Sequence, residues 1–267
     1  MNESPWVRVG LRVATGLVLA FLYLPLVILA IYAFNESRSQ AWPPTAFSLH
    51  WFAEAAGNEA VRRAFVNSVL AATGATSIAL VLGTLASLAV HRFSFFGRDT
   101  ISFLFVLPIA LPGVVTGIAL RTTFQTVGID FGLATIVVGH ATFCVVIAYN
   151  NVVARLRRLP RSPEEASADL GADTWSTFRR ITLPGMGTAL LSGALLAFAL
   201  SFDEIIVTNF TAGPGTQTIP IWIFSAIQRP NALPVVNVVA LILILVSTIP
   251  VYLAQRISGD AGAGGRY

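Results

Sequence analysis

The sequence predicts an all-α membrane protein with six transmembrane helices. Hydrophobic residues make up 55% and charged residues only 11% of the 267 positions, which is more apolar than a soluble domain allows. The apolar residues form six runs, each near the ~20 residues that a helix needs to cross about 30 Å of hydrocarbon. No run alternates as a barrel strand does, so only helices satisfy the backbone in lipid. The predicted spans are roughly 10–34, 67–90, 101–125, 132–154, 187–208 and 234–255, in a single domain over 1–267.

The first run is predicted to be an uncleaved anchor, and prolines mark kinks in later runs. Arg8 and Arg12 precede the first run as in a signal peptide, but the run is too long and no small-residue cleavage site follows it.

Pro108 and Pro112 predict kinks in the third run. An alternative for 107–117 is a hinge that lines a translocation path.

The arginines predict the orientation of the chain. All 17 basic residues are arginine, and a cytoplasmic N-terminus places twelve of them inside and five outside. This asymmetry favours both termini in the cytoplasm. The orientation also explains the net charge of +4, so binding of nucleic acid is not expected.

Several kinds of chemistry are excluded by what the chain lacks. Without lysine it can build neither a P-loop nor a Schiff base, so it has no ATPase site of its own. No Ser/His/Asp set can be assembled, and no catalytic residue is predicted. His140 and Cys144 share a helix face, but two ligands are too few for a metal site, and packing is the favoured interpretation.

The polar segment 160–186 is predicted to begin with a short helix over 163–170. Ser162 is expected to cap it, Pro163 to occupy its first turn and Glu165 to reach back to the cap. Gly171 is expected to end it in the left-handed conformation.

A second helix is expected to follow in the same segment. It begins at Asp173 or Thr174, carries Trp175 and Phe178, and ends at 183–184. Capped helices with apolar side chains predict a docking element. The alternatives are an ordinary loop and an amphipathic segment on the membrane surface.

The residues of this segment resemble the EAA loop of the permease subunits of ABC importers. Glu165-Ala166-Ser167, then Gly171, then Ile181-x-Leu183-Pro184 follow the spacing of that signature, with Ser167 in place of its second alanine. The stretches 47–52, 67–76 and 86–93 resemble the same family. The resemblance implies a type I ABC importer permease fold with a cytoplasmic coupling helix between the fourth and fifth spans, seated in a separate ATPase. We call 160–186 the coupling loop. The implied coupling residues are Glu164, Glu165, Ala166, Ser167, Leu170, Gly171, Ala172, Ile181, Leu183 and Pro184.

Two acidic residues mark the outer end of the fifth predicted span. A carboxylate within a membrane is costly, and its natural partner is a cation, so Asp203 and Glu204 are candidate path residues. The alternative is that headgroups and water solvate both. Because neighbouring helical residues point about 100° apart, we expect Asp203 to face the path and Glu204 to support it.

This region resembles the second permease of spermidine/putrescine importers. The resemblance implies a polyamine as the solute, with an acidic residue at this place in contact with it. Phe202 and Trp222 could supply aromatic faces for its ammonium groups. The alternatives are another solute, such as iron, thiamine or sulfate, and, in a different class, an ion-coupled secondary transporter.

The resemblance also implies the partners of the chain. They are a second, related permease, two copies of an ABC ATPase that hold ATP and Mg, a periplasmic or extracellular substrate-binding protein, and the lipid of the inner membrane. No cofactor is expected on this chain.

Overall fold

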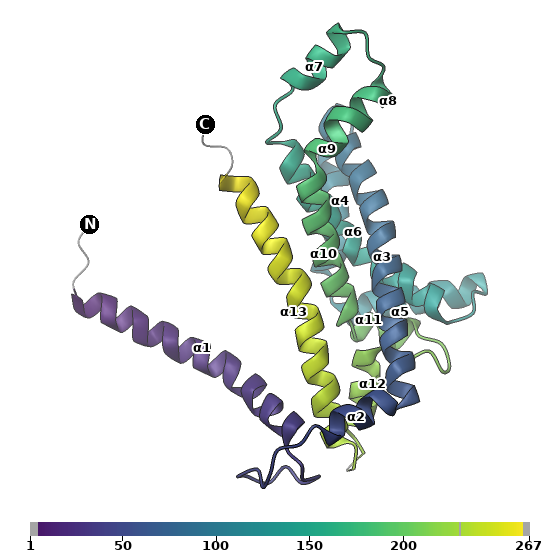
Figure 1. Cartoon of the computed structure of the whole chain (residues 1–267). Helices are drawn as coiled ribbons and strands as arrows, with labels where there is room; N and C mark the ends of the chain where they lie inside the picture. The colour runs from purple at the N-terminus through teal and green to yellow at the C-terminus, as the bar shows by residue number, and fades with distance from the viewer. Residues whose placement is uncertain (1–4, 230, 264–267) are drawn as a thin grey trace. The chain divides into compact units, whose positions relative to one another are not determined.

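The computed structural model describes residues 5–229 and 231–263, and within them every regular element is a helix (Figure 1). One isolated antiparallel bridge pairs Asn35 with Phe47. The chain divides into two compact units, which cover the described residues of 1–62 with 222–245 and of 63–221 with 246–267. The predicted domain over 1–267 also includes 1–4, 230 and 264–267, which lie outside the described residues.

The first unit joins the N-terminal helix to a short helix through a buried tryptophan. The Nε1 of Trp51 donates a hydrogen bond to the carbonyl oxygen of Asn35 at 2.9 Å, and both residues are buried. The rings of Phe34 and Phe52 lie 4.9 Å apart beside this bond. The helices of this unit are α1 (Pro5–Phe34), α2 (His50–Gly57), most of α12 (Ile219–Ala226) and the first part of α13 (Leu233–Ala263).

The second unit holds the longer part of the chain and both candidate sites. Outside the coupling loop, its helices include most of α3 (Glu59–Arg92), α4 (Arg98–Ala110), α5 (Gly113–Val127), α6 (Leu133–Leu156), α10 (Gly187–Phe202), α11 (Ile206–Thr211) and the second part of α13. The coupling loop adds α7 (Ser162–Asp169), α8 (Thr174–Thr177), the π-helical turn η1 (Phe178–Thr182) and α9 (Leu183–Gly185).

Small residues bring α3 and α6 close together in this unit. Ala75, Ala79 and Gly83 recur every four residues on α3, a spacing typical of close helix contacts in membranes. A Cβ atom added at Gly83 would lie 2.8 Å from the Cβ of Ala148, so the two backbones leave no room for a side chain there. One turn earlier on α6, the Sγ of Cys144 lies 3.4 Å from the carbonyl oxygen of Ala197 in α10. The core of the unit therefore lies along α6.

Helices cover all six predicted runs, but the third run is broken into two. Leu111 and Pro112 separate α4 from α5, and Leu111 is extended, with φ −79° and ψ 141°. Proline disfavours the helical conformation of the residue before it and has no N–H to donate. The kink predicted at Pro112 is therefore a break, whereas Pro108 remains inside α4.

The fifth run is also shorter as a helix than predicted. It ends at Phe202, and α11 begins only at Ile206. By length and composition, the described helices that could each cross a membrane are Trp6–Phe34, Glu59–Arg92, Leu133–Leu156 and Leu233–Ile257. The pair Thr174–Gly185 and Gly187–Phe202, bent by 63°, makes a fifth candidate.

Candidate functional site

The first helix of the coupling loop, α7, lies within one residue of its predicted bounds at each end. Pro163 lies in the first turn, as predicted. The predicted capping by Ser162 and Glu165 is wrong, because the N-cap is Arg161 and no side chain caps the helix. The Arg161 carbonyl oxygen accepts from the N–H groups of Glu164 and Glu165 at 3.0 Å each, so Ser162 already lies inside the first turn.

The end of α7 is the left-handed glycine that the sequence predicted. Gly171 has a φ of 78°. Its N–H donates to the carbonyl oxygen of Ala168 at 2.9 Å, and the N–H of Ala172 donates to that of Ser167 at 3.0 Å. These bonds satisfy carbonyl groups that the helix end leaves unpaired.

The second helical segment begins where predicted and ends later. The carboxylate of Asp173 accepts from the N–H of Ser176 at 2.7 Å, which caps α8 and lowers the pKa of Asp173. The predicted end at 183–184 is wrong, since Pro184 lies in the first turn of α9, where its missing N–H costs nothing. The segment ends at Gly185, just before the bend into α10.

Six of the ten predicted coupling residues are exposed, five of them on α7 and the turn after it. The side chain of Leu170 is 88% exposed and that of Trp175 is 67% exposed, although both are apolar. Trp175 is outside the predicted set, whose exposed members besides Leu170 are Glu165, Ala166, Gly171, Ala172 and Pro184. Exposed apolar side chains on capped helices are available for a partner protein.

The remaining predicted coupling residues face inward. Leu183 packs against the cluster of Val152, Leu156 and Met186 at the junction of α6 and α10. Ile181 is half-buried. Ser167 lies on the inner side of α7, where its hydroxyl lies 2.9 Å from that of Thr177.

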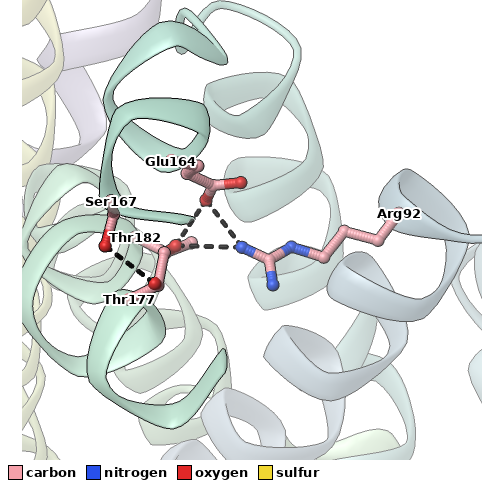
Figure 2. Close-up of polar contacts among 5 residues, drawn as sticks. All are labelled: Arg92, Glu164, Ser167, Thr177 and Thr182. Atoms are coloured by element: carbon pink, nitrogen blue, oxygen red, sulfur yellow. Dashed lines mark hydrogen bonds and ion pairs between the residues drawn. The ribbon is translucent and has the colours of Figure 1, made fainter. Parts of the chain in front are cut away.

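Glu164 joins α7 to two other elements (Figure 2). Its Oε1 accepts a hydrogen bond from the Nη2 of Arg92 at 2.6 Å and another from the hydroxyl of Thr182. The same Nη2 lies 3.0 Å from the Thr182 hydroxyl oxygen, so the three groups form a closed triangle. Partial burial raises the pKa of Glu164, but the bonds from Thr182 and Arg92 and the Arg92 charge outweigh it and hold this pKa below its ordinary value. Glu164 is therefore an anchored carboxylate.

The second candidate site is the acidic turn, which we define as 203–205. Glu204 is held within the turn, because its Oε1 accepts from the N–H of Val207 at 2.8 Å at the start of α11. The side chain of Asp203 is exposed, and no ion pair joins it to any described residue. Of the two acids, Asp203 is the one whose charge remains available.

A buried histidine fixes both helices that flank the acidic turn. His140 of α6 is 0% exposed, and its Nδ1 lies 2.7 Å from the hydroxyl of Ser201 while its Nε2 lies 2.8 Å from that of Thr208. Since the Thr208 hydroxyl donates to the Glu204 carbonyl oxygen, Nε2 must donate to Thr208 and Nδ1 accepts from Ser201. Both ring nitrogens are therefore hydrogen-bonded to hydroxyl groups. Among the described residues, no group of three potential metal ligands lies together.

The two predicted aromatic residues are both buried in the single chain. Phe202 is 1% exposed and packs between Phe65 and Phe198, at 6.1 Å and 5.6 Å between ring centroids. Trp222 is 6% exposed and belongs to the first unit. Their predicted contact with a solute stays a prediction.

Sequence reasoning missed the partners that hold both sites. Arg92 entered the sequence analysis only as part of the arginine distribution, and Thr182, Ser201 and Thr208 did not enter it. A basic residue at the end of a helix beside an acidic loop helix was the available signal for Arg92. His140 was considered as a metal ligand and, in preference, as a packing residue, but not as a hydrogen-bonding one.

Comparison with known proteins identifies the family. The family described as "Binding-protein-dependent transport system inner membrane component" matches residues 79–260. The putrescine transport system permease protein PotI of Escherichia coli (strain K12) is 36% identical, with 96% of this chain and 95% of the relative covered. The spermidine/putrescine transport system permease protein PotC of Haemophilus influenzae is 32% identical, with 90% and 93% covered. The chain therefore belongs to this family of inner-membrane transport components.

The fold agrees with that of a solved ABC transporter. A chain in the crystal structure of a bacterial ABC transporter involved in the import of the acidic polysaccharide alginate is similar with a TM-score of 0.72, at 15% identity and with 96% of both chains covered. The predicted permease fold of a type I ABC importer is confirmed. The chain is thus an inner-membrane transport subunit of an assembly that contains other subunits.

Proposed function

We propose that the chain forms the translocation path of an ATP-driven importer for a small cationic solute, a polyamine such as putrescine or spermidine. The observation that carries the proposal is the exposed carboxylate of Asp203 at the break between α10 and α11, in a chain with putrescine and spermidine/putrescine permeases among its relatives.

The position of Asp203 suits a cation for two physical reasons. It follows the last residue of α10, where the helix dipole places partial negative charge and the last carbonyl groups lack helical partners. Broken helices in transporters commonly present such ends to cations at the binding site. Glu204 is held by the N–H of Val207, so it supports the turn while Asp203 faces the solute.

In this proposal, partner subunits supply the energy for transport. Leu170 and Trp175 present apolar surface that an ATPase cleft would cover. Two copies of the ATPase hold ATP and Mg, a periplasmic or extracellular binding protein delivers the solute, and a second, related permease encloses the other half of the path. The coupling loop and both termini then lie in the cytoplasm, as the arginine distribution favours.

Asp203→Asn tests the cation site in the complete transporter. We expect the apparent KM for putrescine uptake to rise about tenfold or more, because leaving a desolvated charge unpaired costs ~2 kcal/mol or more. The measurement is uptake of labelled putrescine into proteoliposomes. Asp130→Asn, which removes an exposed acid from the loop after α5, is the matched control and should leave KM unchanged.

Three results would contradict the proposal. Unchanged putrescine kinetics in Asp203→Asn would remove the cation site. If the wild type took up iron, thiamine or sulfate but neither putrescine nor spermidine, the transported solute would be that compound and not a polyamine. Uptake driven by an ion gradient without the ATPase would instead identify a secondary transporter.

A further inference from the structure

The helix α7 is held to the rest of the chain by polar contacts rather than by an apolar core. None of its eight residues is buried. Its side chains reach the neighbouring elements through Ser167, which bonds Thr177, and through Glu164, which bonds Arg92 and Thr182. The position of α7 therefore depends on a few hydrogen bonds that single substitutions can remove.

One connection from α7 to the membrane helices runs along the chain and contains a bend. From α8 it passes through η1 and α9 into α10, and the two segments are inclined by 63°. Gly185 and Gly187 flank the bend, and a Cβ atom at Gly187 would meet no atom within 4 Å. Met186, between these glycines, is 0% exposed and packs against Val152 and Leu156, so this connection runs through a packed bend and not along one straight helix.

The other connection runs through Arg92 and contains no bend. Arg92 is the last residue of α3, a continuous helix of 34 residues. Its Nη2 contacts Glu164 of α7 and Thr182 of η1 together, as Figure 2 shows. If α7 and η1 move, the end of α3 must follow or both bonds must break. The side chains of Arg92 and Glu164 are 27% and 33% exposed, so water screens this pair only in part.

We propose that Arg92 is a positioning residue that transmits displacement of α7 to α3 through its bonds to Glu164 and Thr182. The inference rests on the proposed function, because it takes α7 as the element that the ATPase moves. It assigns α3 as a further membrane helix driven by the coupling loop, beside α6 and α10, to which the loop is covalently joined.

A charge exchange tests this role in the complete transporter reconstituted in lipid. The variants are Arg92→Glu, Glu164→Arg and the double exchange, with Arg98→Gln at the start of α4 as a control that removes a charge outside the bridge. For each single variant we expect the amount of putrescine taken up per ATP hydrolysed to fall about fivefold or more, the lower range of typical coupling between sites. The double exchange should recover at least half of the wild-type ratio, and Arg98→Gln should match the wild type.

A second measurement needs no solute. Hydrogen exchange of residues 85–97 is compared between the nucleotide-free transporter and the transporter trapped with ATP and vanadate. The wild type should change at both 162–170 and 85–97, whereas Arg92→Glu should change only at 162–170. If the single variants fail to assemble, Thr182→Val and Arg92→Gln replace them, with the same expected loss at 85–97.

The outcomes separate this inference from the proposed function. Three results would overturn the role of Arg92 alone. They are a wild-type ratio of uptake to ATP hydrolysis in Arg92→Glu, a double exchange that recovers no more than the single variants, and an undiminished change in hydrogen exchange at 85–97 in the variants. Absence of any ATP-dependent change at 162–170 in the wild type would instead overturn docking of the coupling loop. Uptake of a different solute would leave the hydrogen-exchange result intact.

Discussion

At the residue scale, both sites are held by side chains whose partners are distant in sequence. Arg92 and Glu164 are 72 residues apart, and His140 lies 61 residues from Ser201. No local pattern reports such pairs, so sequence reasoning found the acidic and loop residues but not what holds them. It found Asp203 because a carboxylate beside an apolar run is visible locally, and Glu164 only through the resemblance of the loop to the EAA signature.

The lowered pKa of Glu164 predicts a pH-dependent contribution to stability. A carboxyl whose pKa is lower in the folded state stabilises above its unfolded pKa, and this stabilisation is lost as the pH falls through the folded pKa. We expect Glu164→Gln to lower the thermal stability at pH 7 by an amount that corresponds to about 0.5–1 kcal/mol for a partly exposed pair. The difference between wild type and variant should shrink below pH ~4.3, the ordinary glutamate pKa.

Thermal unfolding of the purified chain in detergent across this pH range is the measurement. Glu165→Gln is the control, because Glu165 is exposed and forms no ion pair with a described residue. A difference between wild type and Glu164→Gln that stays constant down to pH 3, or is absent at pH 7, would contradict the stabilising role of the Glu164 charge.

Removal of the His140 ring should destabilise the second unit. His140→Ala leaves a cavity and an unpaired Ser201 hydroxyl beside the acidic turn, at a cost of about 2–4 kcal/mol. Thermal unfolding should show a clearly lower midpoint than for Thr142→Ala on the same helix, whose hydroxyl bonds only the carbonyl of Gly139. Equal unfolding midpoints for the two variants would contradict a stabilising role for the hydrogen bonds of His140.

At the element scale, local start and stop signals were predictable and long-range geometry was not. Pro163 and Gly171 bound α7 as predicted, and Pro112 interrupts the third run. The bend of 63° before α10 and the end of that helix at Phe202 were not predicted. The prediction that Ser162 caps α7 was wrong because the helix begins one residue earlier than predicted. Its N-cap is Arg161, and no side chain caps it.

The left-handed glycine at the end of α7 gives a prediction for this element. Gly171→Val should strain the turn, because the left-handed conformation costs a side chain roughly 1–2 kcal/mol. Hydrogen exchange over 162–172 should become roughly tenfold faster, the factor that corresponds to about 1.4 kcal/mol. Gly187→Val, at a position with an ordinary φ and open space for a Cβ atom, is the control. Equal exchange in both variants would contradict the structural role of Gly171.

At the scale of the whole molecule, the chain is one subunit of a larger assembly. Without lysine it has no P-loop, and the surfaces best suited to other subunits are apolar and exposed at the coupling loop. Composition and apolar runs predicted the class of fold, because the bilayer leaves few ways to satisfy a backbone. The subunit arrangement could not be predicted, because the surfaces that it covers belong to more than one chain.

Cross-linking from the coupling loop tests the central claim most directly. Cys144 is buried, so Leu170→Cys introduces an accessible thiol at an 88% exposed position. In the assembled transporter we expect a cross-linker with one thiol-reactive and one photoactivated end, attached to the thiol at residue 170, to join that residue to the ATPase subunit, and Asp130→Cys to give no such product. Absence of the product at residue 170, or labelling of residue 170 by an impermeant reagent from outside intact cells, would contradict a transport subunit driven through its cytoplasmic loop.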